Sequence, residues 1–243
     1  MKVHAITDVG RVRDSNQDYC MYITDPIGDL PNLFLVADGM GGHKSGDLAS
    51  RFTVDTFREL VQSYDSLDTV TILTRAVKEV NKLLIRKSLE SSDYEGMGTT
   101  LVAATIEGDT LKVANVGDSR LYIINEDICQ ITRDHSLVEE MVQRGQLEKD
   151  EARTHANKNI ITRAIGVDND VTPEIFSVDL EEGSKILICT DGLTNMVDDG
   201  RIQRLVKKGG TVKDITERLV QAAMEGGGKD NITVMVIDPD TER

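Results

Sequence analysis

Five aspartates of this chain stand at or beside the ends of short apolar runs. They are Asp18, Asp38, Asp118, Asp191 and Asp230. Such runs, rich in β-branched residues and bounded by turn residues, are typical of buried strands. Carboxylates at strand ends can gather on one rim of a sheet, where they repel one another unless a hard cation lies between them. Because ligation by oxygen alone suits Mg²⁺ or Mn²⁺, the pattern predicts a metal site.

The composition narrows the classes of partner. The chain has 243 residues, enough to bury a substantial core, with 42 acidic against 28 basic residues and a formal charge of -14. This acidity argues against binding to nucleic acid or an anionic membrane, where a basic face is expected. No apolar run approaches the roughly 20 residues that span a bilayer. We therefore expect no nucleic-acid and no membrane partner.

The cysteines and the N-terminus bear on the cellular compartment. Cys20, Cys129 and Cys189 are far apart and lie in apolar runs, without the paired spacings of a disulfide framework or a zinc site. We expect buried, reduced thiols, which indicate the cytoplasm. Asp8 and Arg11 interrupt the N-terminal segment, so it does not have the pattern of a signal peptide.

No linker or repeat divides the chain, so we expect one domain over residues 1–243. The periodicity of apolar residues predicts the strands and helices that could position the aspartates. Strands are predicted at residues 3–7, 19–24, 33–37, 99–106, 111–116, 121–125, 128–131, 174–178, 185–190 and 232–238. Helices are predicted at residues 45–63, 68–89, 136–144, 148–154, 198–207 and 212–224. Hairpin-like turns between strands and helices inserted in pairs favour an antiparallel α+β layered fold over a doubly wound sheet.

Other motifs of phosphate and ester chemistry do not fit. The glycine-rich residues 39–45 lack the glycine that a phosphate loop needs before its lysine, because His43 stands there. Ser119 is not a nucleophile elbow, since Leu121 replaces the closing glycine. Residues 168–172 match the D-x-D-x-T pattern of aspartyl-phosphate phosphatases. They come late in an antiparallel-looking chain, so a polar turn is the better interpretation.

Six sequence blocks carry a resemblance that covers nearly the whole chain. They are RDSNQD (13–18), VADGMGGH (36–43), MGTT (97–100), VGDSR (116–120), TDGL (190–193) and GKDNIT (228–233). In this order they resemble the metal-dependent protein phosphatase family, the type 2C serine/threonine phosphatases, and their compact bacterial branch. The resemblance implies two stacked antiparallel sheets flanked by helix pairs, which is an αββα sandwich.

The resemblance also implies a reaction and its metal ligands. Asp38 would bridge two Mn²⁺ or Mg²⁺ ions, with the Gly39 carbonyl assisting at one of them. Asp191 and Asp230 would hold the other ion, and Asp18 would orient a metal-bound water directly or from outside the ligand set. That water would attack phosphorus in line, without a phospho-enzyme.

Two further residues have roles by resemblance. Arg13 would clamp the phosphoryl oxygens through its planar guanidinium, so that Asp38 and Arg13 are the expected catalytic residues. Asp118 matches a position that helps Asp191 to form a third, weaker metal site in bacterial relatives.

Two positions depart from the family pattern. Met40 stands where many eukaryotic relatives have a histidine that is proposed to protonate the leaving alcohol, so His43 and a metal-bound water are the alternatives here. Gln17 stands where relatives often have glutamate, which removes one possible carboxylate near the second ion.

We therefore expect a monomeric, cytoplasmic phosphatase that acts on phosphoserine and phosphothreonine proteins and opposes a serine/threonine kinase. Residues 136–159 correspond to a flap beside the active site that shapes substrate choice, or else form an ordinary surface loop. A catalytically inactive adaptor is a competing hypothesis, although Asp38, Asp191 and Asp230 are all retained. A phosphatase of one anti-σ-factor-like phosphoprotein is another, although it usually carries an added module.

Overall fold

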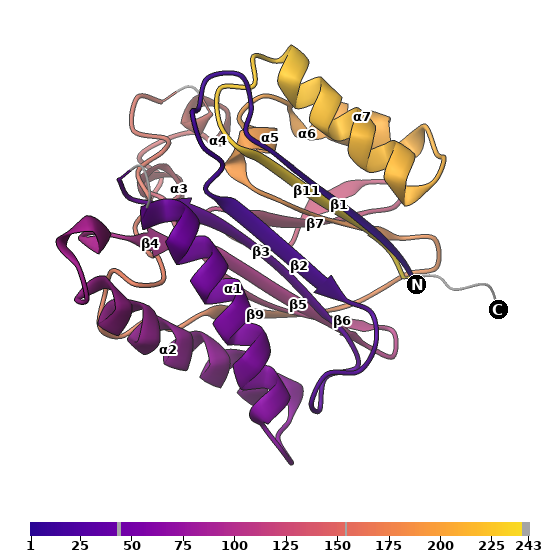
Figure 1. Cartoon of the computed structure of the whole chain (residues 1–243). Coiled ribbons are helices and arrows are strands. Elements are labelled where there is room, and N and C mark those ends of the chain that lie inside the picture. Colours follow the sequence, from indigo (N-terminus) through magenta and orange to yellow (C-terminus); the bar gives the residue numbers. More distant parts are fainter. Residues whose placement is uncertain (43–44, 154, 240–243) are drawn as a thin grey trace.

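Two antiparallel sheets stack face to face in the computed structural model, with a helix pair on the outer face of each (Figure 1). The structure describes residues 1–42, 45–153 and 155–239. Apolar side chains fill three layers, one between the sheets and one beneath each helix pair. The predicted αββα sandwich is confirmed.

The first sheet has the strand order β1-β11-β10-β7-β8. Its strands are β1 (Lys2–Asp8), β11 (Ile232–Asp238), β10 (Lys185–Cys189), β7 (Arg120–Ile124) and β8 (Ile128–Gln130). Helices α6 (Asp199–Lys207) and α7 (Val212–Glu225) supply the apolar side chains that cover it. Its three inner strands, β11, β10 and β7, are almost wholly buried, because helices cover one face and the second sheet covers the other.

The second sheet has the order β2-β3-β5-β6-β9, and a short strand, β4, pairs with β3. Its strands are β2 (Asp18–Ile23), β3 (Leu33–Met40), β4 (Gly98–Thr99), β5 (Leu101–Glu107), β6 (Thr110–Val116) and β9 (Glu174–Asp179). Along β5, Leu101 and Ala103 face the helix layer, whereas Val102 and Ala104 face the other sheet. This alternation is the period of two that a strand imposes.

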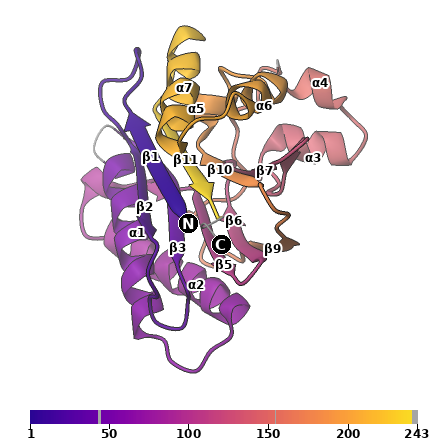
Figure 2. The same ribbon diagram turned by 90° about the vertical axis from the view of Figure 1, so that its right-hand side faces the viewer.

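Helices α1 (Ser45–Ser63) and α2 (Thr69–Ser88) cover the second sheet, followed by the 3-10 turn η1 (Ser92–Tyr94). Asp68 begins α2 by accepting a hydrogen bond from the Thr71 N–H at 3.1 Å, which satisfies a free donor of the first turn. Figure 2 shows α1 and α2 on one side of the stacked sheets and α7 on the other. None of the described helices is long and apolar enough to cross a membrane.

Residues 136–159, referred to below as the flap, contain the short helices α3 (Leu137–Gln143) and α4 (Lys149–Ala152). In Figure 2 these helices project from the side of the sandwich. The two ends of the flap meet at its base, where Ser136 and Ile161 form an isolated antiparallel bridge.

Three details differ from expectation. Strand β3 continues through Met40 instead of ending at Ala37, because β4 pairs with its last two residues. Residues 191–194 form a short helix, α5 (Asp191–Thr194), that the sequence did not predict. Of the three thiols expected to be buried, only Cys189 is: Cys20 is partly buried, and Cys129 is exposed because it lies on the short edge strand β8.

Candidate metal centre

The predicted aspartates converge where the strands of both sheets end. Asp18 on β2 lies directly opposite Asp38 on β3 in the antiparallel register. Burial raises the pKa of Asp38 well above its ordinary value, and the charges of the other aspartates, Asp18, Asp191, Asp118 and Asp230, raise it further. The four other aspartates therefore all lie near enough to Asp38 for their charges to affect it.

The backbone of Asp38 is held from both sides. Its N–H donates to Thr100 Oγ1 at 2.9 Å, and its carbonyl accepts from the Thr99 hydroxyl and the Thr100 N–H, both at 2.9 Å. Gly39 follows in the same strand, and its N–H donates to the Gln17 carbonyl at 3.0 Å. No hydrogen-bond donor among the described residues reaches the Asp38 carboxylate. The strand therefore fixes this carboxylate and leaves its oxygens free to accept.

Asp18 is almost completely buried, and only one of its oxygens has partners. Its Oδ2 accepts from the hydroxyls of Thr190 at 2.9 Å and Thr233 at 2.7 Å. Its Oδ1 is buried and has no hydrogen-bond partner among the described residues. Desolvation outweighs the two hydrogen bonds and raises the pKa of Asp18 to about 7. An orphaned carboxylate oxygen of this kind is where a cation or a water is expected.

Asp191 is the first residue of α5, and Asp230 stands two residues before β11 begins at Ile232. Asp191 Oδ2 accepts from Asn195 Nδ2 at 2.8 Å, and burial followed by the charge of Asp230 raises the pKa of Asp191 to about 6. Asp230 Oδ1 accepts from the Asn231 N–H at 2.9 Å. Each of these carboxylates thus uses one oxygen for a neighbour on its own loop or helix.

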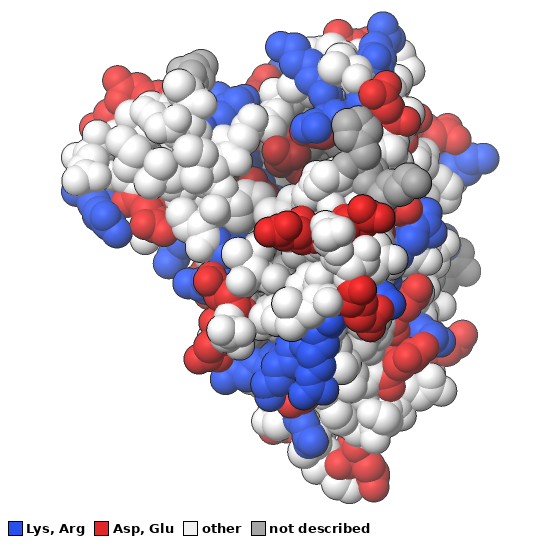
Figure 3. Space-filling model, turned by 60° about the vertical axis from the view of Figure 1, so that its left-hand side comes forward, with Lys and Arg blue, Asp and Glu red and all other residues white. Residues whose placement is uncertain are grey.

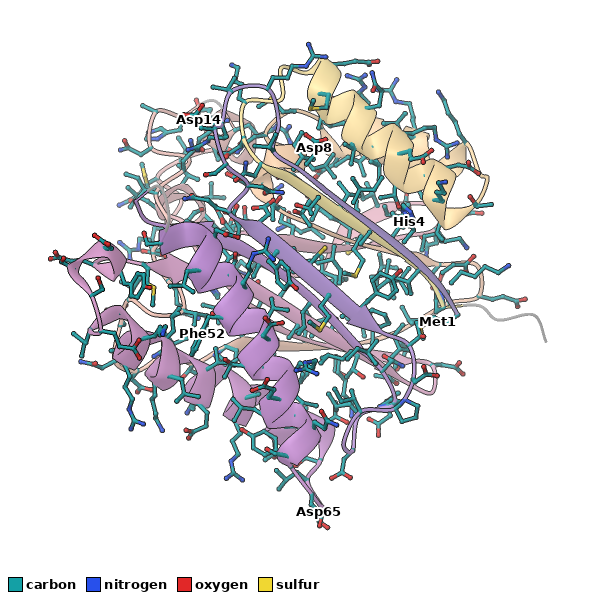
Figure 4. All side chains as sticks on the ribbon, viewed as in Figure 1. Met1, His4, Asp8, Asp14, Phe52 and Asp65 are labelled. Carbon is teal, nitrogen blue, oxygen red and sulfur yellow. The ribbon has the colours of Figure 1, made fainter. Side chains whose placement is uncertain are left out.

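Arg13 reaches the centre from the loop that joins β1 to β2. Its Nη2 donates to Asp230 Oδ2 at 2.8 Å, and 54% of its side chain remains exposed. Figure 4 shows Asp8 at the end of β1 and Asp14 in the loop that follows. The structure therefore brings Arg13 to the aspartates and leaves much of its guanidinium facing solvent.

Asp118, between β6 and β7, completes the group. Burial, followed by the charge of Asp191, raises the pKa of Asp118 well above its ordinary value. Its Oδ1 is buried without a hydrogen-bond partner, like Asp18 Oδ1.

The donor set fits hard divalent cations, although it is not closed around one point. Within the described part of the chain, no three His, Cys, Asp or Glu side chains are arranged so that they could hold an ion. Asp18 and Asp191 each turn one oxygen toward protein donors, and Asp230 turns both of its oxygens toward them. The chemistry of the groups nevertheless suits such an ion, because all five are carboxylates, Asp18 and Asp118 each have an orphaned buried oxygen, and the other four raise the pKa of Asp38.

A cavity of about 690 Å³ extends from the centre beneath the flap. Asp118 and Asp191 lie in its wall, together with Val138, Arg153 and Lys158 of the flap. On the face drawn in Figure 3, acidic side chains lie in and around a depression between two projecting lobes. The segment thus covers a cavity that reaches the aspartates, which favours a flap over an ordinary surface loop.

The two departures from the family pattern have different outcomes. The Gln17 side-chain amide donates a hydrogen bond to the Gly42 carbonyl at 3.4 Å, so it helps to hold the loop before α1 in place. Met40 pairs with Gly98 across the β3–β4 ladder and offers no proton. His43 lies outside the described residues.

Sequence reasoning missed Asn231. Its Oδ1 accepts from the Gln17 N–H at 2.8 Å, and its Nδ2 donates to the carbonyls of Val9 and Ser15, both at 2.9 Å. This side chain therefore ties the loop that carries Arg13 to Asp230. The signal was its position directly after Asp230, because an asparagine before a buried strand can bond main-chain groups of a neighbouring loop.

Comparison with known proteins gives a consistent result. The model of the family described as protein phosphatase 2C matches residues 11–232. The serine/threonine phosphatase stp of Listeria innocua is 38% identical over 237 residues, which is 96% of this chain and 93% of that protein. Protein phosphatase PhpP of Streptococcus pneumoniae is 37% identical over 245 residues, which is 100% of this chain and 99% of that protein.

Solved structures agree with the sequence relatives. Serine/threonine phosphatase Stp1 from Staphylococcus aureus superposes with a TM-score of 0.92 at 36% identity, over 99% of this chain and 95% of that chain. The catalytic domain of the serine/threonine protein phosphatase PstP, in complex with two manganese ions, superposes with a TM-score of 0.83 at 32% identity. That match covers 97% of this chain and 96% of the PstP chain.

Proposed function

This chain belongs to the protein phosphatase 2C family and is a serine/threonine protein phosphatase, and from that premise we propose that it works at a dinuclear Mn²⁺ or Mg²⁺ centre and opposes a serine/threonine kinase. The observation that carries the proposal is the convergence of five aspartates, four of which raise the pKa of the fifth, Asp38. The two manganese ions of the PstP structure support it. In this proposal the enzyme is a monomer in the cytoplasm, and its substrates are phosphorylated proteins.

In this proposal the aspartates would be the ligands of two metal ions at the main centre and of a third ion that binds more weakly. Asp38, free of protein donors among the described residues, would lie between the two ions with the Gly39 carbonyl beside one of them. Asp191 and Asp230 would hold the other ion, and Asp118 would share the weaker site with Asp191. When bound, such ions lower the pKa of a water so that it can attack phosphorus near neutral pH.

The chain's own side chains orient the reactants. Asp18 has its Oδ2 fixed by Thr190 and Thr233, so its unpartnered Oδ1 is aimed in one direction and can accept a proton of the attacking water. Arg13 presents a planar fork of donors to the phosphoryl oxygens, and these contacts strengthen as charge shifts in the transition state.

Metal removal tests the reaction class. We expect protein stripped of metal to leave a phosphothreonine peptide intact and to release inorganic phosphate when Mn²⁺ is added back. Phosphate release is measured against the same peptide without enzyme. Release that is the same with and without metal would overturn the dinuclear mechanism. An intact peptide, with Mn²⁺ shown to bind, would favour the adaptor hypothesis.

Arg13 can be tested apart from the metal ligands. We expect Arg13→Ala to lower kcat/KM for the phosphopeptide by about 100-fold, since loss of one transition-state donor costs roughly 10²–10³. The bound Mn²⁺, measured by elemental analysis, should stay near the wild-type amount, because Asp230 keeps its carboxylate. Arg58→Ala removes an arginine that pairs with Glu59 and serves as the control. Loss of metal in Arg13→Ala would show that Arg13 supports the ligands and not the phosphate.

A further inference from the structure

His135 lies at the base of the flap, where both ends of the flap meet. Its carbonyl accepts from the N–H of Thr162, in the segment that returns from the flap, at 2.8 Å. The next residue, Ser136, begins α3 by accepting from the Glu139 N–H at 3.3 Å and is bridged to Ile161. Any movement of the flap about its base must therefore act on His135.

His135 is also hydrogen-bonded to Gly117, which directly precedes Asp118. His135 Nδ1 accepts from the Gly117 N–H at 3.0 Å, and the His135 N–H donates to the Gly117 carbonyl at 3.0 Å. Only 8% of His135 is exposed, so water competes little for these bonds. Both main-chain polar groups of Gly117 thus bond to one residue at the flap base, and the carbonyl also accepts a longer hydrogen bond, 3.4 Å, from Asn115 Nδ2.

Position 117 requires a glycine. Its φ is +106°, and a Cβ there would lie 2.5 Å from Thr100 Cγ2. On the other side of Asp118, the Ser119 hydroxyl shares a hydrogen bond of 2.8 Å with the Thr100 hydroxyl. Thr100 in turn accepts from the Asp38 N–H. Both neighbours of Asp118 in the chain are therefore held in place. Ser119 is hydrogen-bonded to Thr100 in the core, and Gly117 is hydrogen-bonded to His135 at the flap base.

The hydrogen bonds define the state of the imidazole. Because Nδ1 accepts from Gly117, the ring proton is on Nε2, and Glu174 Oε2 at 3.3 Å can accept it. Arg163 Nη1, also 3.3 Å from Nε2, can only donate, and the Thr172 carbonyl at 3.4 Å accepts from it. Burial and then the charge of Arg163 lower the pKa of His135, which keeps the ring neutral and Nδ1 able to accept.

We propose that His135 is a positioning residue that joins the flap base to Asp118, so that the weaker metal site forms only when the flap base is in place. The inference rests on the proposed function, because it assigns Asp118 to that site. The orphaned Oδ1 of Asp118 has no hydrogen-bond partner of its own, so its position follows from the backbone that His135 holds.

Two variants distinguish the hydrogen bond that His135 Nδ1 accepts from Gly117 from the space that the imidazole ring fills. In His135→Asn the amide oxygen stands as many bonds from Cα as Nδ1 does, so it can still accept from Gly117. In His135→Gln the amide lies one bond further out, near the place of Nε2. We expect His135→Gln to lower the affinity of the weaker site for Mn²⁺ about tenfold and to lower phosphopeptide turnover about tenfold. Loss of a residue that positions a metal ligand typically has an effect of this size. His135→Asn should recover most of both.

A double-mutant cycle shows whether His135 acts through Asp118. In an Asp118→Asn background, His135→Gln should cause no further loss of turnover. Losses that multiply, or an Asn variant as impaired as the Gln variant, would overturn the proposal while leaving the phosphatase function intact. A wild-type protein without Mn²⁺-dependent turnover would instead contradict the proposed function.

The wild-type protein offers a test that needs no variant to fold. Nitrogen-15 NMR of the histidine rings should show His135 neutral at pH 7, with Nε2 protonated and Nδ1 accepting. A spectrum with the proton on Nδ1 would overturn the proposal, because such a ring cannot accept from Gly117.

Discussion

Replacement of Asp38 by asparagine should lower turnover by more than about 100-fold and also make the metal-free protein more stable above neutral pH. The loss of turnover follows from the position of Asp38 between the expected ions, since loss of residues that merely support ligands already costs roughly 10–100-fold. The gain in stability follows from electrostatics. The variant removes a buried charge that four neighbouring carboxylates repel.

The sign of the pH effect comes from the direction of the pKa shifts. Burial and neighbouring charge raise the pKa of Asp38 well above its ordinary value, and they raise that of Asp18 to about 7. Between the unfolded pKa, about 4, and the raised values, the folded state binds more protons than the unfolded state. The free energy of unfolding of the metal-free wild type should therefore fall as the pH rises from about 4 through 7. Asp38→Asn should weaken that fall, so that at pH 8 the metal-free variant has a larger free energy of unfolding than the wild type.

Urea denaturation of metal-free protein at pH 5 and pH 8, with phosphopeptide assays in Mn²⁺, measures both effects. Asp55→Asn, which changes an exposed aspartate on α1, is the matched control and should alter neither. An Asp38→Asn variant that turns over like the wild type would show that the centre lies elsewhere. A variant destabilised at pH 8 would show that the charge of Asp38 is compensated within the folded chain.

Gly192→Ala should destabilise the protein by about 3 kcal/mol, the upper range for overpacking a closed site. A Cβ at Gly192 would lie 1.8 Å from the Asn231 carbonyl oxygen, and that contact is to backbone. The Asn231 side chain is itself bonded to Val9, Ser15 and Gln17, so it cannot retreat without moving the loop that carries Arg13. The substitution should therefore also reduce Mn²⁺ binding, because α5 carries Asp191.

Gly200→Ala provides a close comparison, since Gly200 also lies in the first turn of a helix, α6. Its nearest contact for an added Cβ is a side-chain oxygen of Asp198 at 3.4 Å, which is ordinary van der Waals distance. Alanine is the better helix former, so this variant should be stabilised by up to about 1 kcal/mol. Urea denaturation of both variants checks the pair. Equal effects at the two glycines would show that the approach of Asn231 does not govern stability.

Much of the fold could be predicted because local pattern and burial agree in this chain. The apolar run at residues 33–37 became the buried core of β3, and the periodic run at residues 68–89 became α2, capped by Asp68. Helix α5 was missed because four residues carry no periodicity, and its start depends on the packing of Gly192 against Asn231. Cys129 was wrongly expected to be buried because an apolar run does not show whether its strand lies at a sheet edge.

The sequence by itself determined the chemistry of the candidate site: carboxylates at the ends of strands, an arginine nearby, and ligand types suited to Mg²⁺ or Mn²⁺. The tertiary structure alone decided how each group is held. Asp18 accepts hydrogen bonds from Thr190 and Thr233, which are 172 and 215 residues away in the sequence. His135, at the base of the flap, accepts a hydrogen bond from Gly117. Residue type and spacing report local geometry, whereas desolvation and long-range hydrogen bonds exist only once the two sheets close over the aspartates. Those two effects set the pKa values and the orphaned oxygens on which metal binding depends.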